Sequence, residues 1–141
     1  EAQPLFPPNM ALASLESLRA VQGMGWSDVK ILREGGLITE VYEYQNTFKM
    51  IQSRRLDYYP RGVMEIFVEL SERSAMRGLI IEKNLLLVYP FAFFFFVSPR
   101  CPEVAHAVEI GLQRAYEDGS FIRYFETNGT VRAARGLTSI K

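Results

Sequence analysis

An aromatic run near the middle of the chain constrains the fold more than any other feature. The stretch "YPFAFFFFVSP" covers residues 89–99, and six of its first eight residues are aromatic. A membrane-spanning helix needs about 20 apolar residues, whereas this apolar run covers only residues 85–97 and contains Pro90, which breaks helices. Aromatic and β-branched residues favour strands. We therefore predict two strands, 85–89 and 91–97. Because neither alternates polar with apolar residues, we expect both to be buried inside a helix-covered sheet.

The composition is that of one ordinary domain with a core of its own. The chain has 141 residues, of which 48% are hydrophobic. Sixteen basic residues balance sixteen acidic ones and form no basic stripe, so we expect no nucleic-acid partner. The single cysteine, Cys101, excludes an internal disulfide and a zinc site built on cysteines. Residues 1–15 lack the basic start and apolar run of a signal peptide.

Strand patterns alternate with helical patterns along the first half of the chain. After a helical turn in residues 14–19, we predict strands at 19–23, 40–45, 56–61 and 79–83, and helices at 26–36, 46–55 and 62–73. Ser27 and Asn46 are the expected N-caps. This order predicts an α/β fold with a mainly parallel βαβ sheet. Since the carboxyl ends of parallel strands share one edge, where such sheets bind ligands, we expect residues 23–28, 45–48 and 60–65 to lie together.

The pattern changes after the aromatic run, where only helices are predicted. The segment 101–119 places apolar residues on one helical face. A shorter helix follows from Ser120 and stops at Asn128–Gly129. We therefore divide the chain into an extended lead-in (1–13), an α/β region (14–97), terminal helices (98–130) and a frayed tail (131–141).

The turn "GMGWSD", residues 23–28, is the first candidate site. Its glycines precede a helix, whose free backbone N–H groups attract a carboxylate or phosphate. The turn is neither a dinucleotide fingerprint nor a P-loop, because it lacks the third glycine and the Gly-Lys-Ser/Thr sequence. A tight turn that binds nothing is the alternative interpretation.

Arg61 is the second candidate, at the end of the third predicted strand. Its guanidinium could bind the carboxylate of a ligand in a bidentate manner. Alternatively it pairs with Glu65 or Glu69 of its own chain. Those two glutamates are four residues apart on one helix face, which is compatible with an acid/base pair but more typical of a solvated face. The single histidine, His106, has no nucleophile pattern or second ligand around it, so we expect no catalytic triad and no metal site.

The order of these segments resembles a known family. "SLESLR", a strand, "QGMGWSD", a helix and "FKMIQSRRLDYYPRG" follow one another as in the bacterial extracellular solute-binding proteins of family 3. These are type II periplasmic binding proteins, the amino-acid-binding class that serves ABC importers. The segment "VAHAVEIGLQRAYEDGSF", residues 104–121, is similar to the family's terminal motif, and the similarity extends over residues 14–130. Ser53 stands where the family usually has glycine.

The resemblance implies a second lobe with its terminal helices, in a fragment that lacks the first lobe. The aromatic run would then be the return strand through the hinge, in a core shared by both lobes. Gly62 stands where the family commonly has an aspartate for the ligand's amino group, so that anchor is absent. The predicted ligand-binding residues are Gly23, Gly25, Trp26, Ser27, Asp28, Asn46, Arg61, Gly62 and Glu65.

The implied function is capture of a small polar or carboxylate-bearing, amino-acid-like solute in the periplasm. An ABC transporter permease would be the partner of the full-length protein, and no catalytic residue, cofactor or metal is expected. The alternatives are the ligand-sensing domain of a membrane receptor and a dehydratase-like enzyme on the same fold. Because the terminal helices would lack the cover of a first lobe, we also expect this fragment to self-associate.

Overall fold

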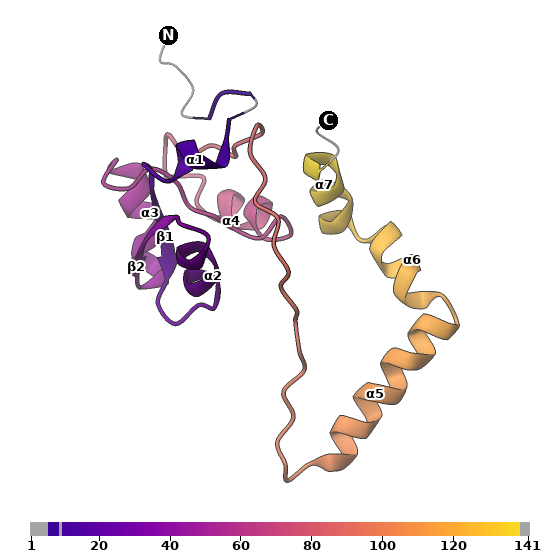
Figure 1. The fold of residues 1–141 in the computed structure, drawn as a ribbon. Helices are drawn as coiled ribbons and strands as arrows, with labels where there is room; N and C mark the ends of the chain where they lie inside the picture. The colour runs from indigo at the N-terminus through magenta and orange to yellow at the C-terminus, as the bar shows by residue number, and fades with distance from the viewer. Residues whose placement is uncertain (1–5, 9, 139–141) are drawn as a thin grey trace. The chain divides into compact units, whose positions relative to one another are not determined.

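The computed structural model describes residues 6–8 and 10–138, which form two compact units that divide between Leu87 and Val88 (Figure 1). The predicted division, after residue 97, lies further along the chain. The helices and strands of the first unit are α1 (Leu12–Leu15), β1 (Arg19–Gly23), α2 (Asp28–Glu34), β2 (Ile38–Tyr42), α3 (Tyr44–Gln52) and α4 (Ile66–Glu72). The second unit contains α5 (Pro102–Glu117), α6 (Ser120–Thr127) and α7 (Gly129–Thr138).

A two-stranded parallel sheet forms the centre of the first unit. β1 pairs with β2 in a register that sets Arg19 opposite Ile38 and Gly23 opposite Tyr42, and α2 connects the two strands. The molecule is therefore a mixed α/β structure with a βαβ unit, as predicted. β1 spans the residues predicted for it, because "RAVQG" places apolar side chains in the core while its backbone pairs on both sides.

The predicted third strand, 56–61, is reduced to a single bridge between Ala20 and Tyr58. The N–H of Val21 donates to the carbonyl of Tyr58 at 3.0 Å. Pairing stops at Pro60, which has no N–H to continue a ladder. The Pro60 carbonyl instead accepts a hydrogen bond from Nε2 of Gln22 at 3.1 Å, so the chain stays beside β1 without forming a strand.

The core of the first unit gathers around β1. Ala20 and Val21 are fully buried, and Phe6 packs edge-on against Tyr58 with ring centres 5.7 Å apart. The other buried apolar residues of this unit are Leu15, Leu32, Leu37 and Leu56.

The prediction that residues 85–89 and 91–97 form buried strands is wrong. None of the described backbone–backbone hydrogen bonds involves residues 85–97, and the side chains of Phe93 and Phe96 are 89% and 94% exposed. The predicted strand at 79–83 is also absent. Strand propensity reflects the fit of a side chain to a pleated, half-buried surface. No neighbouring strand in the described part of the chain offers that surface here.

Several helix boundaries differ from the prediction because the capping residues differ. α3 begins at Tyr44 with Glu43 as its N-cap, so Asn46 lies inside the first turn. Ser27 does occupy the N-cap position of α2, but its side chain makes no capping hydrogen bond. α1 also starts within the segment predicted as an extended lead-in, whose residues 1–5 and 9 lie outside the described part.

α5 and α6 match the two predicted terminal helices. Pro102 opens α5, and Gly119, with φ of 73°, separates the two helices. The Asp118 carboxylate accepts a hydrogen bond from the N–H of Ser120 at 2.8 Å. Hydrogen bonding by the Ser120 side chain, and then by this N–H, lowers the pKa of Asp118. Neither helix contains a buried residue.

A third helix, α7, replaces most of the predicted frayed tail. Asn128 acts as its cap, because its Oδ1 accepts hydrogen bonds from the N–H groups of Thr130 and Val131 at 2.9 and 3.2 Å. Asn128–Gly129, which the sequence predicts as a helix stop, is therefore also a helix start. Residues 139–141 of the predicted tail lie outside the described part. Within residues 6–8 and 10–138, no helix is long and apolar enough to cross a membrane.

Candidate functional site

Three segments meet at the carboxyl edge of the two-stranded sheet. The turn after β1 is tied to the end of β2 by a hydrogen bond from the N–H of Met24 to the carbonyl of Tyr42, at 2.9 Å. The ring of Trp26 lies 5.8 Å from that of Tyr44, at the start of α3, and 6.4 Å from that of Tyr59. The predicted segments 23–28 and 60–65 contact each other through Trp26 and Arg61, and Phe48 of the predicted segment 45–48 contacts Tyr59.

The turn after β1 depends on two glycines. Gly25 has φ of 79°, a left-handed conformation that glycine adopts without strain. At Gly23 an added Cβ would lie 2.4 Å from the nearest carbon of the Trp26 ring. The ring of Trp26 thus packs directly over the backbone at the end of β1, which fixes its position in the site.

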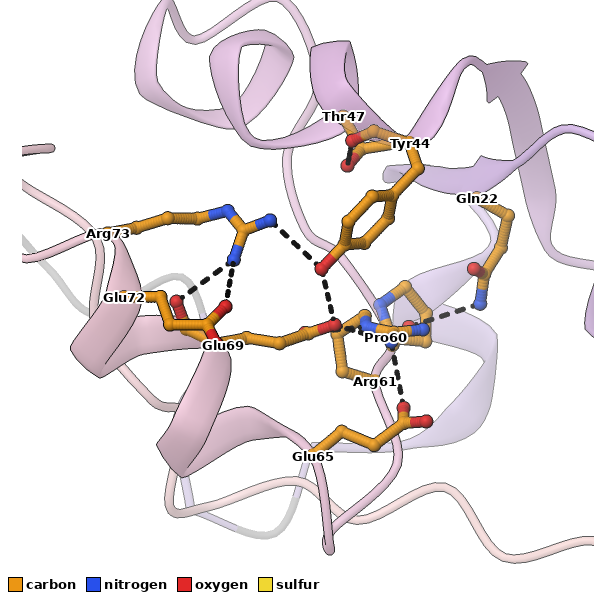
Figure 2. A network of polar contacts seen from close by, with 9 residues as sticks. All are labelled: Gln22, Tyr44, Thr47, Pro60, Arg61, Glu65, Glu69, Glu72 and Arg73. Carbon is orange, nitrogen blue, oxygen red and sulfur yellow. Dashed lines mark hydrogen bonds and ion pairs between the residues drawn. The ribbon is translucent and has the colours of Figure 1, made fainter.

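Arg61 lies between the aromatic rings of Trp26 and Tyr59 and two carboxylates. Figure 2 shows Arg61 with the two carboxylates, those of Glu65 and Glu69. Its guanidinium carbon is 4.4 Å from the centre of the Trp26 ring, close enough for a cation–π interaction. Nε and Nη2 donate to the two oxygens of Glu69 at 2.8 and 2.6 Å, and Nη2 also meets Glu65 at 2.8 Å. Arg61 therefore makes the intramolecular pairs that were the alternative interpretation of the sequence.

The two glutamates that bind Arg61 differ in exposure. The side chain of Glu69 is 11% exposed, whereas that of Glu65 is 51% exposed. Burial alone would raise the pKa of Glu69, but hydrogen bonds from Arg61 and Tyr44 outweigh it, so this pKa lies below its ordinary value. Glu69 is thus a charged structural partner whose two oxygens both accept hydrogen bonds. Glu65 lies at the solvent side of Arg61.

A second arginine extends the network on the other side of Glu69. Nη2 of Arg73 donates to the Tyr44 hydroxyl at 2.9 Å, and that hydroxyl donates to Glu69 at 2.9 Å (Figure 2). Arg73 also lies over the ring of Phe48, 4.0 Å from its centre. Burial and the hydrogen bond to Glu69 raise the pKa of Tyr44.

Five residues that hold this network together are not among the predicted ligand-binding residues, although Glu69 was named as a possible partner of Arg61. They are Tyr44, Phe48, Tyr59, Glu69 and Arg73. Tyr44 and Phe48 are four residues apart, as are Glu69 and Arg73. That spacing places each pair on one side of a helix and is the signal by which they could have been found.

The remaining predicted residues belong to the starts of α2 and α3 and to the turn before α4. Ser27 and Asp28 are at the start of α2, and the N–H of Asn46 donates to the carbonyl of Glu43 at 2.8 Å within α3. A Cβ at Gly62 would come within 3.0 Å of a Glu65 oxygen, so Gly62 leaves room for the carboxylate of Glu65.

An open surface hollow of about 430 Å³ adjoins the turn after β1. Its cations are already engaged: Arg33 donates to the carbonyl of Thr39, and Lys30 pairs with Glu34 at 3.8 Å. The hollow is lined by Gly25, Trp26, Val29, Lys30, Arg33, Glu34 and Val41. Among the described residues, no three His, Cys, Asp or Glu side chains are grouped so that they could hold a metal ion.

Comparison of the chain with family models, with curated proteins and with solved structures finds no match. The function of the chain therefore has to be argued from its own residues and their geometry.

Proposed function

We propose that this chain is the second lobe, with terminal helices, of a type II solute-binding protein of an ABC importer. In this proposal it binds a small carboxylate-bearing or polar solute in the periplasm, without covalent chemistry. One observation carries the proposal: the glycine turn after β1 and Arg61, with its aromatic neighbours, converge at the carboxyl edge of a parallel βαβ unit. Ligands of open α/β sheets bind at that edge.

The chemistry of Arg61 supports a carboxylate as the recognised group. The pair with Glu65 involves a half-exposed carboxylate, and such surface pairs contribute only about 0–1 kcal/mol. A solute carboxylate can therefore replace Glu65 as the partner of Nη2 of Arg61 with little loss of free energy. Glu69 would keep its two hydrogen bonds and hold the guanidinium in position.

The aromatic rings support recognition of the rest of the solute. Trp26 contributes to both the cluster around Arg61 and the open hollow beside the turn. Its ring is only partly buried and would present an apolar surface to the solute. Glu65, the local acidic residue that a dehydratase would use, is bound to Arg61, as is Glu69, which favours binding over catalysis.

The proposal is tested by isothermal titration of the chain with a panel of amino acids and small carboxylic acids. We expect saturable binding of at least one solute, and Arg61→Ala should weaken it by about 1.5–3 kcal/mol, the contribution of a charge-assisted hydrogen bond. Arg77→Ala, at an exposed arginine of the same unit, is the matched control and should leave the affinity unchanged.

Removal of Arg61 alone also leaves Glu69 without its main partner, so a second variant is needed. Replacing both members of a buried pair by apolar residues is often neutral for stability. Arg61→Met combined with Glu69→Leu should therefore stay folded and still lose the solute. Binding with unchanged affinity in this double variant would disprove the role of Arg61, and no binding of any solute by the wild type would disprove the proposed function.

A further inference from the structure

Asn128 and Gly129 form the junction between α6 and α7. Asn128 has an extended backbone, with φ of −65° and ψ of 125°, and Gly129 is the first residue of α7. Of the four asparagines in the chain, only Asn128 precedes a glycine. Because glycine has no side chain, its backbone nitrogen is the least hindered of any residue. This junction is therefore the place where a backbone nitrogen can most readily attack the side-chain amide of an asparagine.

The backbone nitrogen of Gly129 is free to react. Gly129 is exposed, and a Cβ added to it would meet no atom within 4 Å outside its immediate neighbours. Its N–H takes part in none of the described hydrogen bonds, as is usual in the first turn of a helix. Hydroxide can therefore reach this proton without any hydrogen bond of the N–H having to break first.

The side-chain amide of Asn128, by contrast, is held in the cap of α7. Its Oδ1 accepts hydrogen bonds from the N–H groups of Thr130 and Val131 at 2.9 and 3.2 Å. These two bonds keep the amide in one orientation over the first turn of the helix. The reaction between Asn128 and Gly129 therefore depends on how often that turn opens.

Few contacts keep the first turn of α7 closed. The helix has 10 residues, and isolated helices shorter than about 12–15 residues are marginal in water. Among its described side chains only Val131 and Ala134 are buried, and α6 before it contains no buried residue. Helix ends with so little packing open with free energies near zero. The cap therefore protects the amide of Asn128 only weakly.

We propose that Asn128 is a site of spontaneous deamidation, at a rate set by the opening of the α7 cap. Hydroxide removes the proton of the Gly129 nitrogen, which then attacks Cγ of Asn128. The new C–N bond closes a cyclic imide, while the amide nitrogen of Asn128 takes up a proton and leaves as ammonia. Water then opens the imide at either of its carbonyls, which gives aspartate or isoaspartate.

The two products differ in their effect on α7. Aspartate keeps an acceptor at the cap position and adds a negative charge at the helix N-terminus, which stabilises a helix. In isoaspartate the main chain runs through the former side-chain carbons, so the backbone of the junction is one carbon longer. The geometry of the cap is lost in that product.

Mass spectrometry of tryptic peptides tests the deamidation. The full chain is incubated in mildly alkaline buffer, and the peptide 124–132, which contains Asn128, is followed for the mass gain of exchanging NH2 for OH and for an isoaspartate peak. We expect conversion of this peptide at a rate proportional to the hydroxide concentration. Asn46 and Asn84, which precede threonine and leucine, are internal controls and should stay unmodified.

Gly129→Ala is the matched variant. Alanine fits the open space at this position, and its narrower backbone freedom alone should slow the conversion of Asn128 roughly two- to fivefold. Complete unfolding in urea removes the cap. Because the cap opens readily, the rate in urea should exceed the rate in native buffer by less than about tenfold.

Limited proteolysis at Arg132 tests the effect on the cap. Trypsin requires the first turn of α7 to be open, so cleavage after Arg132 should be faster in the isoaspartate fraction than in the fresh protein. Asn128→Asp keeps the cap and should be cleaved no faster than the fresh protein.

Three results would overturn the proposal. They are no conversion at Asn128, equal rates of conversion in Gly129→Ala and the wild type, and a rate in urea more than about tenfold above the native rate. The last result would show that α7 stays closed. Equal cleavage after Arg132 in the isoaspartate fraction and in the fresh protein would disprove the loss of the cap.

Discussion

Glu69 is the residue that links the aromatic cluster around Arg61 and Arg73 into one network. The rings of this cluster are those of Trp26, Tyr44, Phe48 and Tyr59. Its carboxylate accepts hydrogen bonds from Arg61 and from Tyr44, while its backbone carbonyl accepts one from Arg73 at 3.1 Å. Three elements are tied to this one side chain: the segment after Tyr58, α3 and α4. The cluster therefore depends on the charge of Glu69 more than on any of its rings.

Glu69→Gln should lower the free energy of unfolding by about 3 kcal/mol, because it leaves the guanidinium of Arg61 without its buried counter-charge. The side chain of Arg61 is only 13% exposed, so water cannot replace the carboxylate. Urea unfolding followed by the fluorescence of Trp26, the single tryptophan, measures the change.

Glu65→Gln is the matched control for this experiment. Glu65 contacts the same guanidinium but is half exposed, so its loss should change the free energy of unfolding by less than about 1 kcal/mol. Equal destabilisation by both variants would contradict the distinction between a structural and an exchangeable carboxylate.

The stability of the first unit should also depend on pH through Glu69. The folded-state pKa of this carboxyl lies below its ordinary value of 4.5. The stabilisation is therefore fully present above pH 4.5 and is lost as pH falls through the lower folded-state pKa. The difference in unfolding free energy between wild type and Glu69→Gln should shrink as the solution is acidified below pH 4.5. A difference that stays constant down to about pH 3 would show that Glu69 does not titrate as this linkage requires.

At the scale of elements, the turn between β1 and α2 is held by the contact of Gly23 with the Trp26 ring. Gly23→Ala would place a methyl group within 2.4–2.8 Å of three ring carbons. Overpacking of this kind destabilises by about 1–3 kcal/mol, and displacement of Trp26 should also shift its fluorescence maximum.

Gly35→Ala is the control for that substitution. Gly35 has φ of −78°, and an added Cβ would meet only backbone carbonyl oxygens at 3.4 Å. The free energy of unfolding of the Gly35→Ala variant should stay within about 0.5 kcal/mol of the wild-type value. An unchanged Trp26 spectrum in Gly23→Ala would show that the ring is not held by this contact.

The sequence predicted best the elements that are marked by residues within the element itself or directly beside it. β1 was located by a short apolar run between turn residues, and α5 by a proline in its first turn and Asp118–Gly119 at its end. The aromatic run failed because a strand needs a partner, and strand propensity does not supply one. Residues 91–97 have the composition of a core strand and no described strand beside them.

The candidate site was predicted in part for a similar reason. Trp26, Arg61 and Glu65 were found because they follow the ends of predicted strands. Glu69 was predicted only as one of two possible partners of Arg61. Its hydrogen bond to Tyr44 depends on how α3 and α4 pack, and no spacing within one segment encodes that packing. The choice between a ligand carboxylate and Glu69 as the partner of Arg61 was left open by the sequence for the same reason.

At the scale of the whole molecule, the two units differ in how they are stabilised. The first unit has a core around β1, with Ala20 and Val21 fully buried. In the second unit, α5 (16 residues) and α6 contain no buried residue, and among the described side chains α7 buries Val131 and Ala134. Rings at the junction of these two helices, Tyr116 and Phe121, contact each other at 4.2 Å, but isolated helices of this length are marginal in water.

This difference predicts that the two units unfold separately. Trp26 fluorescence reports only the first unit, and its urea midpoint should not depend on protein concentration. Far-UV circular dichroism includes α5, α6 and α7. The part of its transition that they contribute should move to higher urea as concentration rises, because the self-association expected of the terminal helices would stabilise the associated form by mass action. Coincident transitions that are independent of concentration in both probes would mean that the chain unfolds as one cooperative monomer, and the terminal helices would then owe their stability to their own chain.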